Sequence, residues 1–295
     1  MRRNINSTYT NLTIIAIISI CISIFCSCSE SKRNTESFVF SVMGDVPRSE
    51  TEKTILQEQI RKHNKQSKSQ FVFHVGDIKS GQSYCDEENY KIVADYLKQF
   101  KVPVFIVPGD NEWNDCKNPN QAWDFWIKYF SRFDQNWDVP FVVLRQNNYP
   151  VNISFVKNNI LFIAINLVGG RIHNKVEWDI MQQNAVDWIE DQTVNNNVNA
   201  AVILAQANFD EKHKIFAGQF LKLVENFKKP IMFIHGDGHV WLHDDPWMLP
   251  NMIHVQVDKG GIADPLEVTV TGNNKINFEF NRNPFREKDI LINNR

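Results

Sequence analysis

Short runs of apolar, β-branched and aromatic residues recur along the chain and predict buried strands. Most of these runs are too short for a helix, and turn-forming residues bound them. The predicted strands are Phe38–Met43, Phe71–Val75, Val104–Val107, Asn152–Val156, Ile160–Asn166, Ala201–Leu204, Ile231–Ile234, Met252–Val257, Leu266–Val270 and Ile276–Phe280.

Helical periodicity separates many of these runs. In one such segment, Met181, Ala185, Trp188 and Ile189 follow the i, i+4, i+7, i+8 spacing of a packed helix face. The predicted helices are Thr51–Lys65, Glu88–Phe100, Ala122–Phe133, Val176–Asp191 and Glu211–Phe227.

The order of these elements predicts an α/β fold. Early alternation of strands and helices indicates parallel strands joined by crossover helices. The tail from Met252 to Phe280 is expected to form antiparallel strands, and Ser131 to Pro150 a surface excursion. About 260 residues of one α/β domain would bury ample core.

The first residues resemble an export signal. Arg2 and Arg3 precede a nearly unbroken apolar run from Leu12 to Phe25, which is too short for an ordinary membrane span of about 20 residues. The sequence Phe25-Cys26-Ser27-Cys28 then resembles a bacterial lipobox with Cys28 as the lipidated residue, although Phe25 replaces the usual Leu and Cys26 is a rival. A plain secreted protein and an uncleaved anchor are the alternatives.

This interpretation divides the chain into three parts. Residues 1–28 form the signal peptide and lipobox, residues 29–36 a polar tether, and residues 37–295 the folded domain. The expected location is the periplasm or cell surface, anchored by lipid to a bacterial membrane. The domain is expected to be a monomer.

Charge excludes one class of partner. The formal net charge is −2, and no Lys/Arg-rich run occurs, so a nucleic-acid partner has no support.

Two cysteines remain once the export segment is removed. Cys85 and Cys116 are an even number in an oxidising compartment, which predicts a disulfide between them. Two buried free thiols are the alternative.

A Gly-Asp pair follows four of the predicted strands, either directly or after one further residue. These segments are Gly44-Asp45, Gly76-Asp77, Gly109-Asp110 and Gly236-Asp237. Ligands collect beyond the carboxyl ends of strands in open α/β sheets, so the four acids are expected at one edge. Converging carboxylates repel one another unless a cation lies between them. The pattern therefore predicts a divalent metal site.

The same motifs resemble the calcineurin-like metallophosphoesterase family. Its members carry, in order, DxH, GDxxD, GNHE/D, a lone His after a strand, and GHxH. This chain has GDVP (Gly44–Pro47), GDIKSG (Gly76–Gly81), GDNE (Gly109–Glu112), QAN (Gln206–Asn208) and GDGH (Gly236–His239). The resemblance implies a four-layer α-β-β-α sandwich of two mixed sheets.

The resemblance also implies ligands. Asp45 falls on the aspartate of the first metal, Asp77 on the bridging aspartate, Asp110 on the metal-binding Asn, and His239 on the last His of GHxH. Gln206 replaces the lone His.

Asp237 replaces the first His of GHxH, and Pro47 replaces the His of DxH. The resulting oxygen-rich set favours one or two hard ions, Mg²⁺, Mn²⁺ or Ca²⁺, over Zn²⁺, with Fe also expected in such sites.

One departure affects catalysis directly. Asn111 replaces the family His that resembles a proton donor to the leaving group, and an amide cannot act as a general acid. Hydrolysis would then depend on the metal ions held by Asp77 and its neighbours.

Other residues near the motifs are explained by ordinary structural roles. His74 and His235 are expected to pack against the sheet edge, and Trp113 to pack in a loop. Glu112 is expected either to orient a ligand or to cap a helix, and Arg48 to be an exposed arginine or to meet a phosphate.

Three functions fit this sequence. The first is metal-dependent hydrolysis of a small phosphorylated ester. The second is a catalytically weak or inactive metal-binding lipoprotein that kept the fold, which the replacements Pro47, Asn111 and Gln206 favour. A carbohydrate- or peptide-binding domain is a weaker third, because no aromatic stripe is visible.

Overall fold

The computed structural model describes residues 37–273 and 275–286. The predicted signal peptide, Cys28 and the tether lie outside these residues. No helix in the described part of the chain has the length and apolar character needed to cross a membrane.

One sheet has five strands in the order β12-β11-β1-β2-β3. The strands β1, β2 and β3 are parallel, whereas β11 is antiparallel to β1 and β12 to β11. Their bounds are β1 Phe38–Met43, β2 Ser69–His74, β3 Val104–Ile106, β11 Leu266–Thr271 and β12 Asn277–Asn281.

The other sheet has seven strands in the order β4-β5-β6-β7-β8-β10-β9. Its centre, β6 to β10, is parallel, and β5, β4 and β9 add antiparallel edges. Their bounds are β4 Leu144–Gln146, β5 Tyr149–Lys157, β6 Ile160–Ala164, β7 Ala200–Leu204, β8 Ile231–His235, β9 Leu242–Asp244 and β10 Met252–Gln256.

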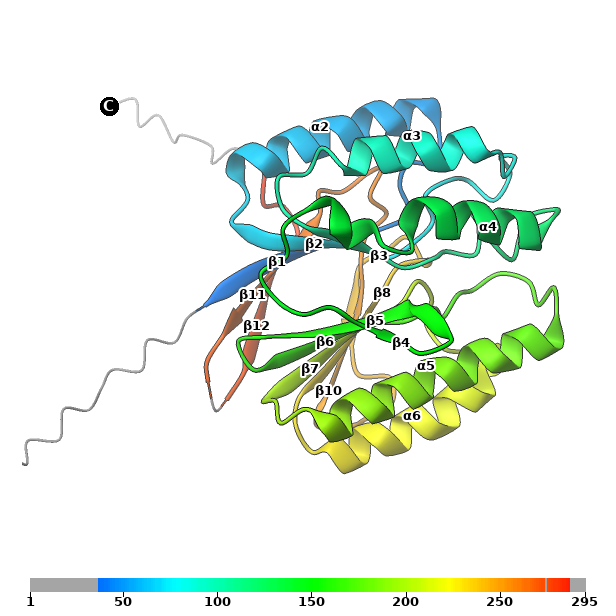
Figure 1. The fold of residues 1–295 in the computed structure, drawn as a ribbon. Coiled ribbons are helices and arrows are strands. Elements are labelled where there is room, and N and C mark those ends of the chain that lie inside the picture. Colours follow the sequence, from blue (N-terminus) through cyan, green and yellow to red (C-terminus); the bar gives the residue numbers. More distant parts are fainter. Residues whose placement is uncertain (1–36, 274, 287–295) are drawn as a thin grey trace, which may run out of the picture. The chain divides into compact units, whose positions relative to one another are not determined.

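Helices cover the outer faces of the two sheets, which gives the four layers seen in Figure 1. Helices α2, α3 and α4 lie over the five-stranded sheet, and α5 and α6 over the seven-stranded sheet. The α helices are α2 Glu50–Gln66, α3 Glu87–Leu97, α4 Pro119–Phe130, α5 Lys175–Asn195 and α6 Lys214–Phe227, with 3-10 turns η1 Phe133–Asn136 and η2 Glu211–His213. The predicted sandwich of two mixed sheets is confirmed.

An aromatic core joins the two sheets. The ring centroids of Phe71 and Phe162, from opposite sheets, are 5.2 Å apart, and those of Phe105 and Phe155 are 4.8 Å apart. Rings at these distances contribute packing beyond their buried area. The core holds the sheets face to face, so that the carboxyl ends of strands from both sheets meet at one edge.

Two expectations from the sequence are wrong in part. The run at Met252 was expected to be antiparallel, but β10 pairs parallel with β8 and antiparallel only with β9. The segment from Ser131 to Pro150 was expected at the surface, yet Phe133 is buried and β4 forms within it. Edge strands of three residues carry too little periodicity to be predicted locally.

Candidate metal centre

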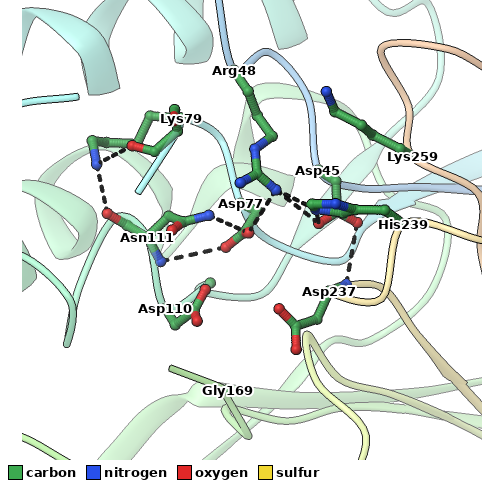
Figure 2. Close-up of polar contacts among 12 residues, drawn as sticks. Asp45, Arg48, Asp77, Lys79, Asp110, Asn111, Gly169, Asp237, His239 and Lys259 are labelled. Carbon is green, nitrogen blue, oxygen red and sulfur yellow. Dashed lines mark hydrogen bonds and ion pairs between the residues drawn. The ribbon is translucent and has the colours of Figure 1, made fainter. Parts of the chain in front are cut away.

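The four predicted aspartates meet at one edge of the sandwich (Figure 2). Asp45, Asp77 and Asp110 follow β1, β2 and β3, and Asp237 follows β8 of the other sheet. The ligand atoms form two groups, and within each group all the ligand atoms lie within 4.8 Å of one another. The first set is Asp45, Asp77 and His239, and the second set is Asp77, Asp110 and Asp237.

The backbone of these residues is unusual. Asp45, Asp77, Asp237 and His239 have φ values of 56°, 61°, 64° and 63°, which is the left-handed region. Non-glycine residues rarely adopt this conformation, which costs free energy unless the surroundings impose it. The chain therefore turns sharply after β1, β2 and β8, and these turns aim the side chains at a common point.

Gly109 is required by the closeness of the two central loops. A Cβ at Gly109 would lie 2.2 Å from the backbone nitrogen of Asp77 and 2.3 Å from its Oδ1. At Gly76 a Cβ would lie 2.8 Å from Gly109 Cα, and its φ of +85° also favours glycine. Glycine at both positions lets the loops after β2 and β3 touch.

Asp77 lies at the centre of the cluster and is buried. The Asn111 side-chain amide donates a hydrogen bond to Asp77 Oδ2, and the Asn111 backbone N–H lies 3.4 Å from Oδ1. Asn111, predicted at the position of the family His, is therefore hydrogen-bonded to the shared acid.

Crowding of carboxylates shifts their protonation. Burial, and then the charges of Asp110, Glu112 and Asp45, raises the pKa of Asp77 well above its ordinary value. Burial likewise raises the pKa of Asp110. Burial, followed by the charges of Asp110 and Asp45, raises the pKa of Asp237 to about 6. A cation among these groups would relieve the repulsion.

Glu112 orients the loops rather than capping a helix. Its carboxylate accepts hydrogen bonds from the backbone N–H groups of Gly109 at 2.6 Å, Asp77 at 3.1 Å and Ile78 at 3.2 Å. Burial raises the pKa of Glu112 to about 7, although these backbone donors oppose the shift. The side chain therefore fixes the turns that carry Asp77 and Asp110.

Gln206 does not present the oxygen that the sequence suggested. Its Oε1 accepts a hydrogen bond from the Gly169 backbone N–H at 2.8 Å. Its Nε2 lies 3.2 Å from Asp110 Oδ1 and 3.4 Å from Asp77 Oδ1. Because the Gly169 N–H can only donate, it fixes the amide orientation, and Gln206 faces the acids as a donor.

Two basic residues at the site were not singled out as site residues. The Arg48 guanidinium enters the first set, 3.7 Å from Asp45 Oδ1 and 3.6 Å from Asp77 Oδ2. Lys79 is buried and donates to the backbone oxygens of Ser80 at 2.8 Å and Asn111 at 2.7 Å. Burial lowers the pKa of Lys79, while Glu112, Asp77 and Asp110 oppose that shift. Their only sequence signal was a position within three residues of a motif aspartate.

The other neighbouring residues have the packing roles that the sequence predicts. His74 is buried and its Nε2 hydrogen-bonds to the Val46 carbonyl at 2.9 Å. His235 is buried against His254, with 2.8 Å between their Nε2 atoms, and Trp113 is buried in its loop. Pro47 follows Val46 in the first loop.

Cys85 and Cys116 form a disulfide, with their Cα atoms 6.0 Å apart. The bond matches the predicted pair and excludes the free-thiol alternative. It joins the loop after Asp77 to the loop after Asp110, so two of the three loops that carry the second set are covalently linked.

The donor set fits divalent metal ions. Asp45 Oδ1 is buried without a hydrogen-bond partner, and it lies 3.1 Å from His239 Nε2. Two sets of ligands that share one aspartate match the arrangement of two-metal sites. Carboxylate oxygens with a single imidazole suit hard or borderline ions such as Mg²⁺ and Mn²⁺.

Solved structures of other proteins share this fold. Similar solved structures include a dimetal phosphatase from Danio rerio, which is 11% identical, with a TM-score of 0.54, 82% of this chain and 98% of that chain covered. A purple acid phosphatase from yellow lupin seeds is 14% identical, with a TM-score of 0.52, 84% of this chain and 52% of that chain covered.

A third structure with this fold is described as an anchor. It is the anchor in the inner membrane complex of Plasmodium, 13% identical, with a TM-score of 0.50, 86% of this chain and 87% of that chain covered. At these identities the likeness concerns the fold. No curated protein sequence gives a significant match.

The sequence profile of the calcineurin-like phosphoesterases matches residues 40–241. This segment contains every strand end that carries a candidate ligand. The chain belongs to the calcineurin-like phosphoesterase family.

Proposed function

We propose that this protein hydrolyses phosphate esters of small molecules with the help of divalent metal ions. The observation that carries the proposal is the pair of ligand sets that share Asp77 and combine residues from both sheets. Divalent ions bound there would activate water and neutralise charge that develops on the phosphoryl group.

The chain's own residues supply binding and orientation. Asp77, Asp110 and Asp237 of the second set, with Asp45 and His239 of the first, would hold the metal. Asn111 donates to Asp77 and keeps that carboxylate in place. Arg48 adds a permanent positive charge at the same edge, where it can contact a phosphoryl oxygen.

Substrate choice follows from the loss of the family His at position 111. An amide N–H is too weak an acid to protonate a departing alkoxide, and general acid help typically contributes about 10²–10⁴-fold. Esters whose leaving groups are stable as anions, such as aryl phosphates, are therefore the preferred substrates. Alkyl phosphates are cleaved more slowly.

The place of action that we propose is the periplasm or the cell surface, with the protein anchored by lipid to a bacterial membrane. The lipobox-like Cys28 would anchor a monomeric domain there through residues 29–36. Growth with a labelled fatty acid tests this: wild type takes up label, and Cys28→Ser does not. Label on the Cys28→Ser protein would disprove Cys28 as the lipidated residue, and no label on wild type would disprove the anchor.

Activity is tested on aryl phosphate mono- and diesters with added Mn²⁺. Wild type is expected to turn over, and Asp77→Asn to lose roughly 10³-fold in rate, because both ligand sets lose a carboxylate. Asp187→Asn is the matched control, since Asp187 lies exposed on α5 and accepts only from Gln183 among the described residues.

The alternative is a metal-binding protein without turnover. The Asn111 contact with Asp77 and the donor orientation of Gln206 favour it. Metal binding without hydrolysis of any aryl ester, in wild type and Asp187→Asn alike, would establish it and reject the enzyme.

A further inference from the structure

Arg48 lies at the point where the three residues of the first set converge (Figure 2). Its Nη1 is 3.7 Å from Asp45 Oδ1 and 3.6 Å from Asp77 Oδ2, and it makes a short contact with His239 Nε2. These are the atoms that would have to coordinate a metal ion in the first set.

The contact with His239 puts the guanidinium at the ring nitrogen that faces the acids. His239 Nε2 also lies 3.1 Å from Asp45 Oδ1, so it is the imidazole nitrogen that a metal ion in the first set would need. Metal entry at the first set therefore requires Arg48 to leave all three partners.

The second set lacks such a cation. Among residues 37–273 and 275–286, no lysine or arginine forms an ion pair with Asp110 or Asp237. Its acids receive neutral amide donors from Gln206 and Asn111. Apart from Asp77, whose Oδ2 lies 3.6 Å from Arg48 Nη1, the crowded carboxylates of the second set have no ion pair with a basic residue, and this makes it the stronger site for a divalent ion.

We propose that Arg48 is a built-in cation that replaces the metal ion of the first set, so that the chain holds one divalent ion, in the second set. The binding part of this inference stands on the geometry alone. Its catalytic meaning, that Arg48 supplies the second positive charge facing the phosphoryl group, rests on the proposed function.

The start of α2 holds Arg48 in this position. The Arg48 backbone N–H donates to Glu52 Oε2 at 2.7 Å, while the Glu52 N–H donates to Ser49 Oγ at 3.2 Å. Glu52 Oε1 in turn binds Lys259 Nζ at 2.6 Å. The Arg48 backbone is therefore held by hydrogen bonds, and its side chain points toward the acids.

Only part of the Arg48 guanidinium is used by the acids. Nη1 makes the contacts with the first set, and among the described residues no hydrogen bond uses Nε or Nη2. The side chain is 20% exposed, so these donors can reach a ligand from outside. A planar guanidinium can hold two oxygens of a phosphoryl group side by side.

The test counts metal ions per chain. Protein saturated with Mn²⁺ and passed through a desalting column is expected to retain one Mn²⁺ per chain by elemental analysis. Arg48→Met frees the first set and is expected to retain two, with the electron paramagnetic resonance signal of two spin-coupled ions. Thermal unfolding of each variant shows whether it is folded.

Two controls separate position from overall charge. Lys53→Met removes a positive charge from the first turn of α2, where Lys53 pairs with Glu50 and lies outside the first set, so it should still retain one ion. The double variant Arg48→Met with His239→Ala loses a ligand of the freed set and should return to one ion.

The outcomes separate this inference from the proposed function. Two ions on wild type, or one on Arg48→Met, would overturn the role of Arg48, whatever the activity. One ion on wild type and two on Arg48→Met, without turnover of any aryl phosphate, would uphold it and reject the enzyme. Failure of every variant to bind Mn²⁺ would overturn both.

Discussion

The two ligand sets share Asp77 yet differ in how their charge is balanced. In the first set, two carboxylates and an imidazole surround the Arg48 guanidinium. In the second, Asp110 and Asp237 form no ion pair with a lysine or arginine among the described residues, and Asp77 is the one acid that also contacts Arg48. Asp77 and Asp110 accept from the amides of Asn111 and Gln206, and their pKa values are raised. Similar strand ends thus produce one site whose charge the chain itself balances and another that needs an external cation.

The largest expected effect separates the two sets directly. Asp110→Asn should weaken Mn²⁺ binding about 10²–10³-fold, because removing one partner of a poorly solvated charge cluster costs about 3–5 kcal/mol. Asp45→Asn should weaken it only about tenfold, since Asp45 faces Arg48 and touches the ion's surroundings indirectly. Titration calorimetry measures both.

Equal losses at the two positions would contradict the difference between the sets. Asp187→Asn on the exposed face of α5 again serves as the control for the loss of one carboxylate.

The disulfide gives the next effect in size, because it joins the two loops that carry Asp77 and Asp110. Cys85 and Cys116 are separated by 31 positions, so replacing both with Ser should lower the free energy of unfolding by about 3–4 kcal/mol. Urea unfolding measures this, and Mn²⁺ affinity should fall as well because the loops separate.

Reduction of wild type with a thiol should reproduce both changes. Unchanged stability and Mn²⁺ affinity would show that the aromatic core alone holds these loops.

The smallest effect is a pH dependence carried by Glu112, the buried support of the second set. Its pKa is about 7 in the folded protein against an ordinary 4.5, so the folded state keeps a proton that the unfolded state has released. Stability should therefore fall as pH rises from about 4.5 to 7, by on the order of 3 kcal/mol.

Buried histidines contribute a pH dependence of the opposite sign, and the measurement must remove that contribution. Burial lowers the pKa values of His63 and His74 to about 4, so their contributions are lost as pH falls below about 6.5. The measured quantity is thus the difference in unfolding free energy between wild type and Glu112→Gln, both metal-free. A difference that stays constant from pH 4.5 to 7 would refute the role given to Glu112.

Much of the fold was predictable because its signals are local. The run Phe38–Met43 matches β1, and the periodic segment around Met181 and Trp188 matches α5 to within a few residues. The pairing of β10 with β8 was not predictable, because an apolar run does not state which neighbour it joins. The short edges β4 and β9 carry almost no pattern.

The candidate site divides in the same way. The sequence by itself determined that four aspartates leave four strands after glycine-bearing turns, because strand period and turn chemistry are local properties. Only the tertiary structure decided that these acids form two sets around Asp77, that Gln206 turns its oxygen to Gly169, and that Arg48 stands in the first set. Those outcomes depend on contacts between side chains that the fold brings together from both sheets. Residues so far apart in the sequence leave no local pattern from which such contacts could be predicted.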